Sequence, residues 1–197
     1  MKKQFGAILL SVVILLAACK KDNTTNSTSG IEGSYNFKYI SAKTNSSVTG
    51  SSGDRAVTTS DYSTISNGGV VIFNNGSLTA KGLTYSVNTQ AKAYEYDGAT
   101  LIDSLSYPFS FTLPSSNSTG QYKIIGTDSI YFPQGGLTVP TDGSGSYQGS
   151  AGGGRFTLSG NLLTIIQNVS RDSTFTDSGE TYKMIQTATT SIVLEKQ

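Results

Sequence analysis

The sequence predicts an all-β protein built from a series of antiparallel strands. Apolar and polar residues alternate with a period of two along much of the chain. Turn-forming groups of Asn, Asp and Gly separate these alternating runs. Ser, Thr, Asn and Gly supply 87 of the 197 residues, whereas strong helix formers are scarce. We expect an up-and-down antiparallel barrel of about eight to ten strands, with a β-sandwich as the alternative, because either arrangement hides the strand edges.

The clearest strands are the aromatic ones. A strand beginning at Gly33 would place three alternating aromatic side chains on one face: Tyr35, Phe37 and Tyr39. A second run alternates through Leu83, Tyr85 and Val87, and the longest run puts five apolar side chains on one face: Leu105, Tyr107, Phe109, Phe111 and Leu113. Pro108 falls on the opposite face of that run and has no N–H to donate. This predicts a strand at the edge of a sheet, or one that carries a bulge.

Turn signals divide the remaining strands. They lie at residues 74–76, 97–98, 126–128 and 160–161, where Asn, Asp and Gly tolerate the positive φ of tight hairpins. Two segments, 120–126 and 154–160, share the spacing Gly-x-aromatic-x-aliphatic-x-Gly, and each predicts a strand followed by its antiparallel partner. Residues 56–66 are the segment in which we expect a short helix or turn.

The N-terminal segment has the three parts of a bacterial lipoprotein signal. Lys2 and Lys3 precede an apolar run, residues 5–17, that is shorter than the roughly 20 residues of a membrane-spanning helix. The run ends in Leu-Ala-Ala-Cys, which resembles a lipobox, and Cys19 is the only cysteine. We therefore expect residues 1–18 to be removed and Cys19 to carry the lipid. Residues 20–30 contain no apolar side chain, so residues 19–30 form a flexible tether and residues 31–197 form the folded domain.

The lipobox resemblance implies a protein held on a membrane surface by acyl chains. Lys20 follows the cysteine at the place where aspartate retains lipoproteins at the inner membrane. We therefore expect an outer-membrane location in the cell envelope, on either the periplasmic or the surface face.

Composition excludes several kinds of chemistry. Without Lys2 and Lys3 the chain has 12 basic and 13 acidic residues and no basic patch, which argues against a nucleic-acid partner. The chain has no histidine, so Ser-His-Asp triads and histidine metal sites are absent, and lipid occupies the only thiol. We expect no enzyme activity, no metal and no cofactor.

Carboxylates remain as the weaker candidates. Glu95 and Asp97 stand two residues apart, a spacing that glycosidases use, but we expect them on a solvated face with Asp97 in a turn and with Tyr94 and Tyr96 facing inward. The loop that begins at Asp142 lacks the later glutamate of a calcium loop, so we interpret it as a flexible loop.

The lipobox, the polar tether, the opening Gly-x-aromatic strand and the turn-bounded hairpins at 73–76 and 156–163 together resemble the lipocalin-like lipoproteins of Bacteroidetes-type bacteria. Lipocalins proper carry tryptophan where this chain has Tyr35. The Asp-Ser triplets at Ser104, Ser129 and Ser173 also resemble an O-glycosylation motif of exported proteins from such bacteria; chance and turn chemistry explain them equally well.

We hypothesise a non-enzymatic, membrane-anchored lipoprotein that binds a small apolar or amphipathic ligand in the barrel. The expected lining residues are aromatic: Tyr35, Phe37, Tyr39, Tyr85, Tyr107, Phe109 and Phe111. The alternative is a barrel filled by these side chains. Such a protein would be a structural or adhesive accessory of the cell envelope that binds a protein or a glycan through its loops.

Overall fold

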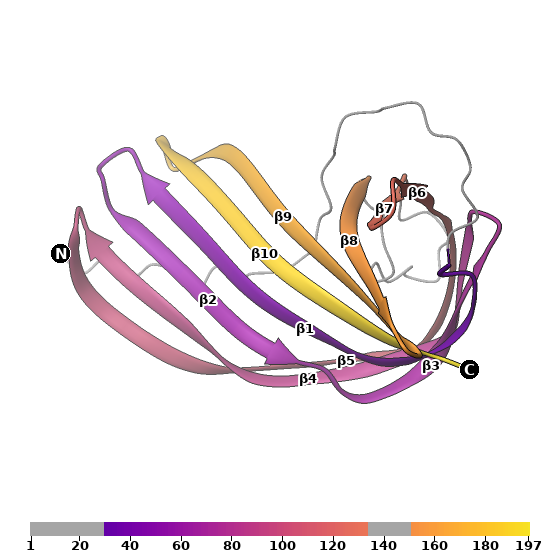
Figure 1. Cartoon of the computed structure of the whole chain (residues 1–197). Helices are drawn as coiled ribbons and strands as arrows, with labels where there is room; N and C mark the ends of the chain where they lie inside the picture. Colours follow the sequence, from indigo (N-terminus) through magenta and orange to yellow (C-terminus); the bar gives the residue numbers. More distant parts are fainter. Residues whose placement is uncertain (1–29, 134–150) are drawn as a thin grey trace.

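The computed structural model describes residues 30–133 and 151–197. These residues form one antiparallel sheet of ten strands, with no helix among them (Figure 1). The strands are β1 (Gly33–Gly50), β2 (Arg55–Ser63), β3 (Ile65–Asn74), β4 (Ser77–Asp97), β5 (Thr100–Gln121), β6 (Lys123–Ile125), β7 (Ser129–Phe132), β8 (Gly152–Ser159), β9 (Leu162–Asp177) and β10 (Glu180–Lys196). The all-β, antiparallel prediction is confirmed. The predicted signal peptide, Cys19 and the loop at Asp142 lie outside the described residues.

The expected turns are present at Asn75, Gly76, Gly98, Gly126 and Gly160. Each of these residues has a positive φ and joins two antiparallel strands. The strand with Pro108 is β5, and among the described strands it pairs only with β4, as expected of an edge strand.

Residues 56–66 form extended structure, so the prediction of a short helix or turn there is wrong. Most of this segment is β2, which pairs with β1 on one side and with β4 on the other. β3 continues between the same two neighbours, and Thr64 joins β2 to β3. The backbone N–H of Ile40 donates to Thr64 Oγ1 (2.9 Å), and Thr64 N–H donates to the Ile40 carbonyl (2.8 Å). β2 and β3 therefore act as one long, interrupted strand whose threonine-rich sequence suits a sheet.

The strands follow one another around the sheet. β1 pairs with the β2–β3 strand, and β4 pairs with that strand and with β5. From β6 to β10 each strand pairs with the next, and β10 pairs back onto β1 from Tyr35 opposite Lys196 to Gly50 opposite Tyr182. The chain passes from β5 to β6 through Tyr122, so the strand beside β4 continues directly into the strand beside β7. Tyr122 N–H donates to the Gly76 carbonyl (2.8 Å), which fixes this crossing at one end of the molecule.

Large apolar side chains fill the end of the sheet near the crossing. Tyr35 is fully buried, lies edge-on to Phe73 with ring centroids 5.8 Å apart, and donates from its hydroxyl to the Ile31 carbonyl (2.8 Å). Phe73 lies edge-on to Tyr122 (5.2 Å). This core continues through a layer of aliphatic side chains: Ile40, Leu163, Ile165, Ile192 and Leu194. We call the sheet face that carries these side chains the inner face.

A bulge in β1 changes the face of one predicted residue. Phe37 pairs with Leu194 but Tyr39 pairs with Val193, so Lys38 is an extra residue. Ile40 then takes the inward position opposite Ile192, and Tyr39 is 41% exposed on the outer face. The prediction that Tyr35, Phe37 and Tyr39 share one face is therefore wrong for Tyr39.

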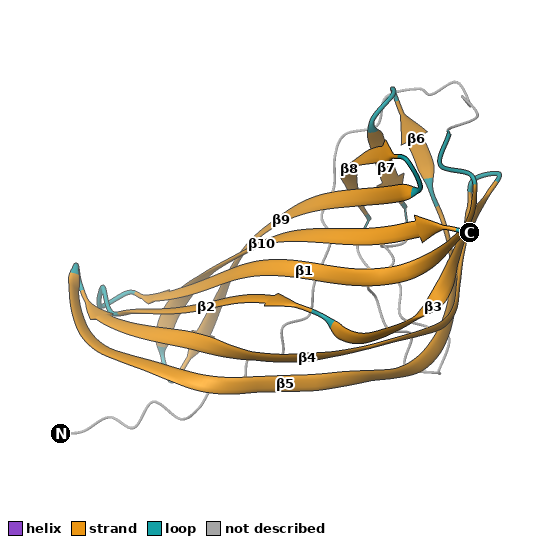
Figure 2. Ribbon diagram, turned by 60° about the horizontal axis from the view of Figure 1, so that its bottom comes forward, coloured by secondary structure: helices purple, strands orange, loops and turns teal. Residues whose placement is uncertain are grey.

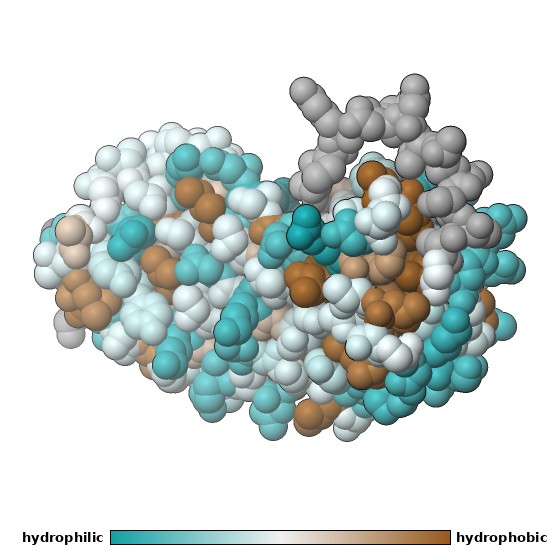
Figure 3. Space-filling model, in the orientation of Figure 1, coloured by the Kyte–Doolittle hydropathy of each residue, from teal (hydrophilic) through white to brown (hydrophobic). Residues whose placement is uncertain are grey.

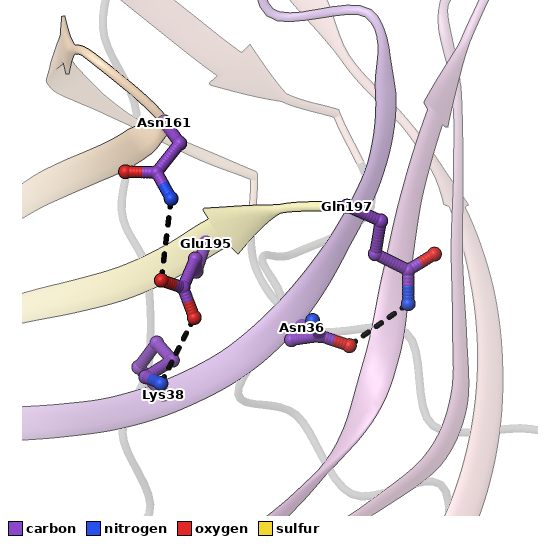
Figure 4. A network of polar contacts seen from close by, with 5 residues as sticks. All are labelled: Asn36, Lys38, Asn161, Glu195 and Gln197. Carbon is purple, nitrogen blue, oxygen red and sulfur yellow. Dashed lines mark hydrogen bonds and ion pairs between the residues drawn. The ribbon is translucent and has the colours of Figure 1, made fainter.

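Polar contacts on the outside join the start of β1 to the end of β10 (Figure 4). Lys38 Nζ and Asn161 Nδ2 donate to the two oxygens of Glu195, at 3.0 and 3.2 Å, and Gln197 Nε2 donates to Asn36 Oδ1 (2.8 Å). The hydrogen bond from Lys38 holds the pKa of Glu195 below its usual value. Because these groups face solvent, they contribute more to strand register than to stability.

The long strands extend well beyond the short strands β6–β8, which lie at one end of the molecule (Figures 1 and 2). The sheet of β5, β4, β2, β1, β10 and β9 is curved, with the inner face concave. Within the two described ranges, no helix has the length and hydropathy needed to cross a bilayer.

Candidate ligand-binding site

Beyond the packed core, the strand register arranges the inner face as three rows that cross the sheet from β9 to β5. Residues directly opposite one another in a sheet share a face, so the pairings define the rows. The β2–β4 pairing runs from Arg55 opposite Tyr96 to Thr59 opposite Lys92, and the first two rows continue this register to Tyr62 with Thr89 and Ser60 with Ala91. The first row, next to the core, is Gln167, Thr190, Ala42, Tyr62, Thr89 and Phe109. The second row is Val169, Ala188, Thr44, Ser60, Ala91 and Tyr107. The third row is Arg171, Gln186, Ser46, Thr58, Ala93 and Leu105.

The β4–β5 end of these rows is aromatic. We call Tyr85, Tyr107, Phe109 and Phe111 the aromatic row. Tyr85 lies 5.8 Å from Phe111, and Phe111 lies 5.9 Å from Phe109, between ring centroids. Phe37 of the core lies 6.0 Å from Tyr85, so the ring contacts continue from the core into the three rows. Phe111 is 40% exposed and Leu105 is 61% exposed although both lie on the inner face. The apolar surface is therefore only partly covered.

The β9–β10 end of the rows is polar. We call Ser46, Gln167, Arg171, Gln186 and Thr190 the polar patch. Five buried side-chain atoms in the described part of the chain have no hydrogen-bond partner, and three of them belong to this patch: Ser46 Oγ, Gln167 Nε2 and Thr190 Oγ1. Gln167 and Thr190 are only 1% and 2% exposed. Leaving such groups unpaired costs about 1–3 kcal/mol each, so they mark a place where a partner would be stabilising.

Small side chains lie between the two ends. The second row has alanine, serine and threonine at its four central positions. A barrel filled along this row would need bulky residues at these four positions. On β8, beyond the β9 end of the rows, Gly154 pairs with Ile130. A Cβ at Gly154 would lie 2.9 Å from Gln167 Cγ, so Gln167 packs directly over this glycine.

Two tyrosines, Tyr62 of the first row and Tyr85 of the aromatic row, are kept neutral. Burial, with a smaller contribution from the neighbouring Tyr62, raises the pKa of Tyr85 to about 12, and burial also raises the pKa of Tyr62. Both phenols are therefore hydrogen-bond donors throughout the physiological pH range.

Of the seven aromatic residues predicted to line a ligand site, the structure brings four together as the aromatic row. Phe37, 5% exposed, and Tyr85, 6% exposed, both belong to the packed core, so the members of the aromatic row that are not buried are Tyr107, Phe109 and Phe111. Tyr35 lies deep in the packed end, and Tyr39 is on the outer face. Sequence reasoning missed the polar patch because its members come from strands far apart in the chain, and only the pairing of residue 46 with residue 186 brings them together.

The carboxylate pair lies at the far end of β4. Glu95 and Asp97 are exposed, and Asp97 precedes the turn at Gly98 as expected. Glu95 is on the inner face opposite Ala56, whereas Tyr96 pairs with Arg55, whose guanidinium lies 4.3 Å from its ring centroid. The prediction that Tyr94 and Tyr96 face inward is therefore wrong, because both occupy the alternate positions of β4 whose side chains lie on the outer face.

The three Asp-Ser triplets lie on different strands. Ser104 is exposed on β5, Ser129 begins β7 and donates to Asp128 Oδ1 (3.2 Å), and Ser173 lies on the inner face of β9 opposite Met184. In the described parts of the chain, no group of three acidic or cysteine side chains is placed to hold a metal ion.

The fold and the inner face define an all-β protein with a concave face that is polar at one end and aromatic at the other. Comparison with known proteins finds no matching family model, no matching curated protein and no matching solved structure.

Proposed function

We propose that the protein is a non-enzymatic lipoprotein, anchored through Cys19 in the cell envelope, that binds a small amphipathic or apolar ligand on the inner face of a lipocalin-like barrel. The observation that carries the proposal is the contrast along the inner face. Large side chains pack one end, whereas the three rows beyond it combine uncovered aromatic rings with small side chains and unpaired buried polar atoms.

Two features favour a barrel over a sandwich. All ten strands belong to one continuous sheet in which β10 pairs back onto β1, and β5 continues into β6 beside β7. A sandwich would divide the strands between two separate sheets. In a closed sheet, the inner face becomes the lining of a lumen.

The outer surface bears on the alternative of a partner bound from outside. On the face of the molecule drawn in Figure 3, hydrophobic side chains form several patches among hydrophilic and neutral ones, the most extensive near the short strands β6–β8. Large contiguous hydrophobic patches are typical of protein-binding surfaces. Four ion pairs lie on the outer face: Lys38 with Glu195, Lys43 with Asp61, Arg155 with Asp128, and Lys183 with Asp172.

Native mass spectrometry of the chain isolated from its own cells tests this proposal. We expect a non-covalent small molecule that leaves on denaturation, and a diacylglyceryl modification on an N-terminal cysteine peptide. A Phe109→Ala, Phe111→Ala variant should lose the bound molecule, whereas Tyr39→Ala on the outer face should keep it. A bare mass from the unaltered protein would contradict ligand binding and favour the accessory role through the loops.

A further inference from the structure

We propose that the polar patch binds the head group of a single-chain amphipath with an anionic oxygen head, such as a long-chain carboxylate. The hydrocarbon chain of this ligand crosses the sheet along the second row towards the aromatic row. This inference rests on the proposed function and adds to it the class of ligand and its direction.

The polar patch is rich in hydrogen-bond donors. Ser46, Gln167, Arg171, Gln186 and Thr190 can all donate hydrogen bonds, and none of them carries negative charge. Three of their buried atoms have no partner among the described residues. Arg171 can only donate and the unpaired Gln167 Nε2 is a donor, whereas the hydroxyls of Ser46 and Thr190 can donate or accept. A carboxylate accepts through both oxygens, so it can take a hydrogen bond from each of these groups.

The polar patch carries one charge, the guanidinium of Arg171. Arg171 is exposed, and the structure gives it no ion pair among the described residues, as it gives none to Lys92 on the outer face of β4. By register Arg171 shares the inner face with Gln186 and Ser46. The acidic side chains of the inner face lie elsewhere, at Glu95 and Asp103 on β4 and β5 and at the β9–β10 turn. An unpaired guanidinium beside unpaired donors favours an anion over a neutral or cationic head group.

The members of the polar patch surround one position on β10, Ala188. Gln167 and Arg171 are four residues apart on β9, so about 13 Å separates their Cα atoms, with the second row midway between them. On β10 this midpoint is Ala188, whose methyl group leaves space above the sheet. A head group over Ala188 is flanked by Gln167 and Thr190 on one side and by Arg171 and Gln186 on the other.

The second row gives the ligand's hydrocarbon chain a path from the polar patch to the aromatic row. From Ala188 the second row continues through Thr44, Ser60 and Ala91 to Tyr107. Thr44 Oγ1 and Ser60 Oγ are 2.6 Å apart and satisfy each other, so they present little free polarity to a hydrocarbon chain. Four strand spacings separate β10 from β5, about 19 Å along the sheet, a length suited to a long alkyl chain. The chain ends against Tyr107 and Phe109.

Photoaffinity labelling of the full-length chain, as isolated from cells, tests this proposal. The probe is hexadecanoic acid with a diazirine near the end of its alkyl chain, and its methyl ester is the matched probe without charge. We expect the acid to label peptides of β4 and β5 and the ester to label them about tenfold less, because charge-assisted hydrogen bonds are roughly twice as strong as neutral ones. Unlabelled hexadecanoate should compete, and hexadecyltrimethylammonium should not.

Variants locate the head group. Arg171→Met and Thr190→Val should each reduce labelling by the acid several-fold and leave labelling by the ester unchanged. Lys183→Met and Thr189→Val make the same chemical changes on the outer face of β10 and should change neither. Equal labelling by acid and ester, or acid labelling that survives both inner-face substitutions, would overturn the head-group assignment while leaving the proposed function intact. Failure of both probes to label any inner-face peptide would overturn the proposed function itself.

Discussion

Replacing Thr190 with valine should stabilise the protein, although most substitutions of buried residues destabilise. Thr190 is 2% exposed, and its hydroxyl has no hydrogen-bond partner among the described residues. An unsatisfied buried polar group costs about 1–3 kcal/mol, and valine keeps the branched shape and the preference for strands. We therefore expect the free energy of unfolding to rise by about 1 kcal/mol in the ligand-free protein.

The assay is urea denaturation followed by far-UV circular dichroism, because the chain has no tryptophan. A gain of about 1 kcal/mol should also raise Tm by about 2–4 °C in a domain of this size. Thr189→Val is the control. Thr189 is exposed on the other face and donates to Asn168 Oδ1 (2.8 Å), so its replacement should change stability by at most about 0.5 kcal/mol. A loss of 1 kcal/mol or more in Thr190→Val would refute the view that this hydroxyl is unpaired.

Three further predictions concern the core, the backbone at Gly69, where the register of β3 with β4 shifts, and alkaline pH. Phe73→Ala should cost about 3–5 kcal/mol in urea denaturation because its ring is 1% exposed, whereas Phe111→Ala, at 40% exposure, should cost less than half as much. Gly69 has φ +107° and a Cβ there would lie 2.7 Å from Leu83 Cα, so Gly69→Ala should lower Tm markedly; an unchanged Tm would contradict this. Tyr85 has a pKa of about 12 when folded and ionises near 10 when unfolded, so its contribution is complete below pH 10 and is lost as the pH rises to 12. Stability should fall over that window, and Tyr85→Phe should reduce the fall by about 2–3 kcal/mol, measured by urea denaturation at each pH.

The sequence predicts strands and turns well because both depend on neighbouring residues. The alternation through Leu105 and Phe111 gives the correct inner face, and Pro108 correctly indicates a strand with one free side. The bulge at Lys38 is different, because it depends on the way in which β1 meets β10. In the sequence, aromatic residues alternate with a period of two through Tyr39. In the sheet, the extra residue Lys38 shifts the register with β10 and puts Tyr39 on the outer face.

The far half of the sheet is harder to predict for a second reason. On β1 the inner face carries Thr44 and Ser46 and the outer face carries Asn45 and Ser47, so both faces are polar and alternation carries no information. The same reason explains the assignment of residues 56–66 to a helix or turn. The polar patch follows only from pairing three strands, and that pairing is a property of the whole fold.

The pairing of β1 with β10 also sets an order of events in time. Residues 35–50 can pair with β2 and β3 early, but they find their β10 partners only after residues 182–196 have been synthesised, so the contacts that complete the sheet have a very large sequence separation. Such non-local pairing slows folding, because a long loop must close before the hydrogen bonds between β1 and β10 form. Until then β1 and β9 each present an unpaired edge, the kind of surface on which chains aggregate. The arrival of β10 covers both edges in one step.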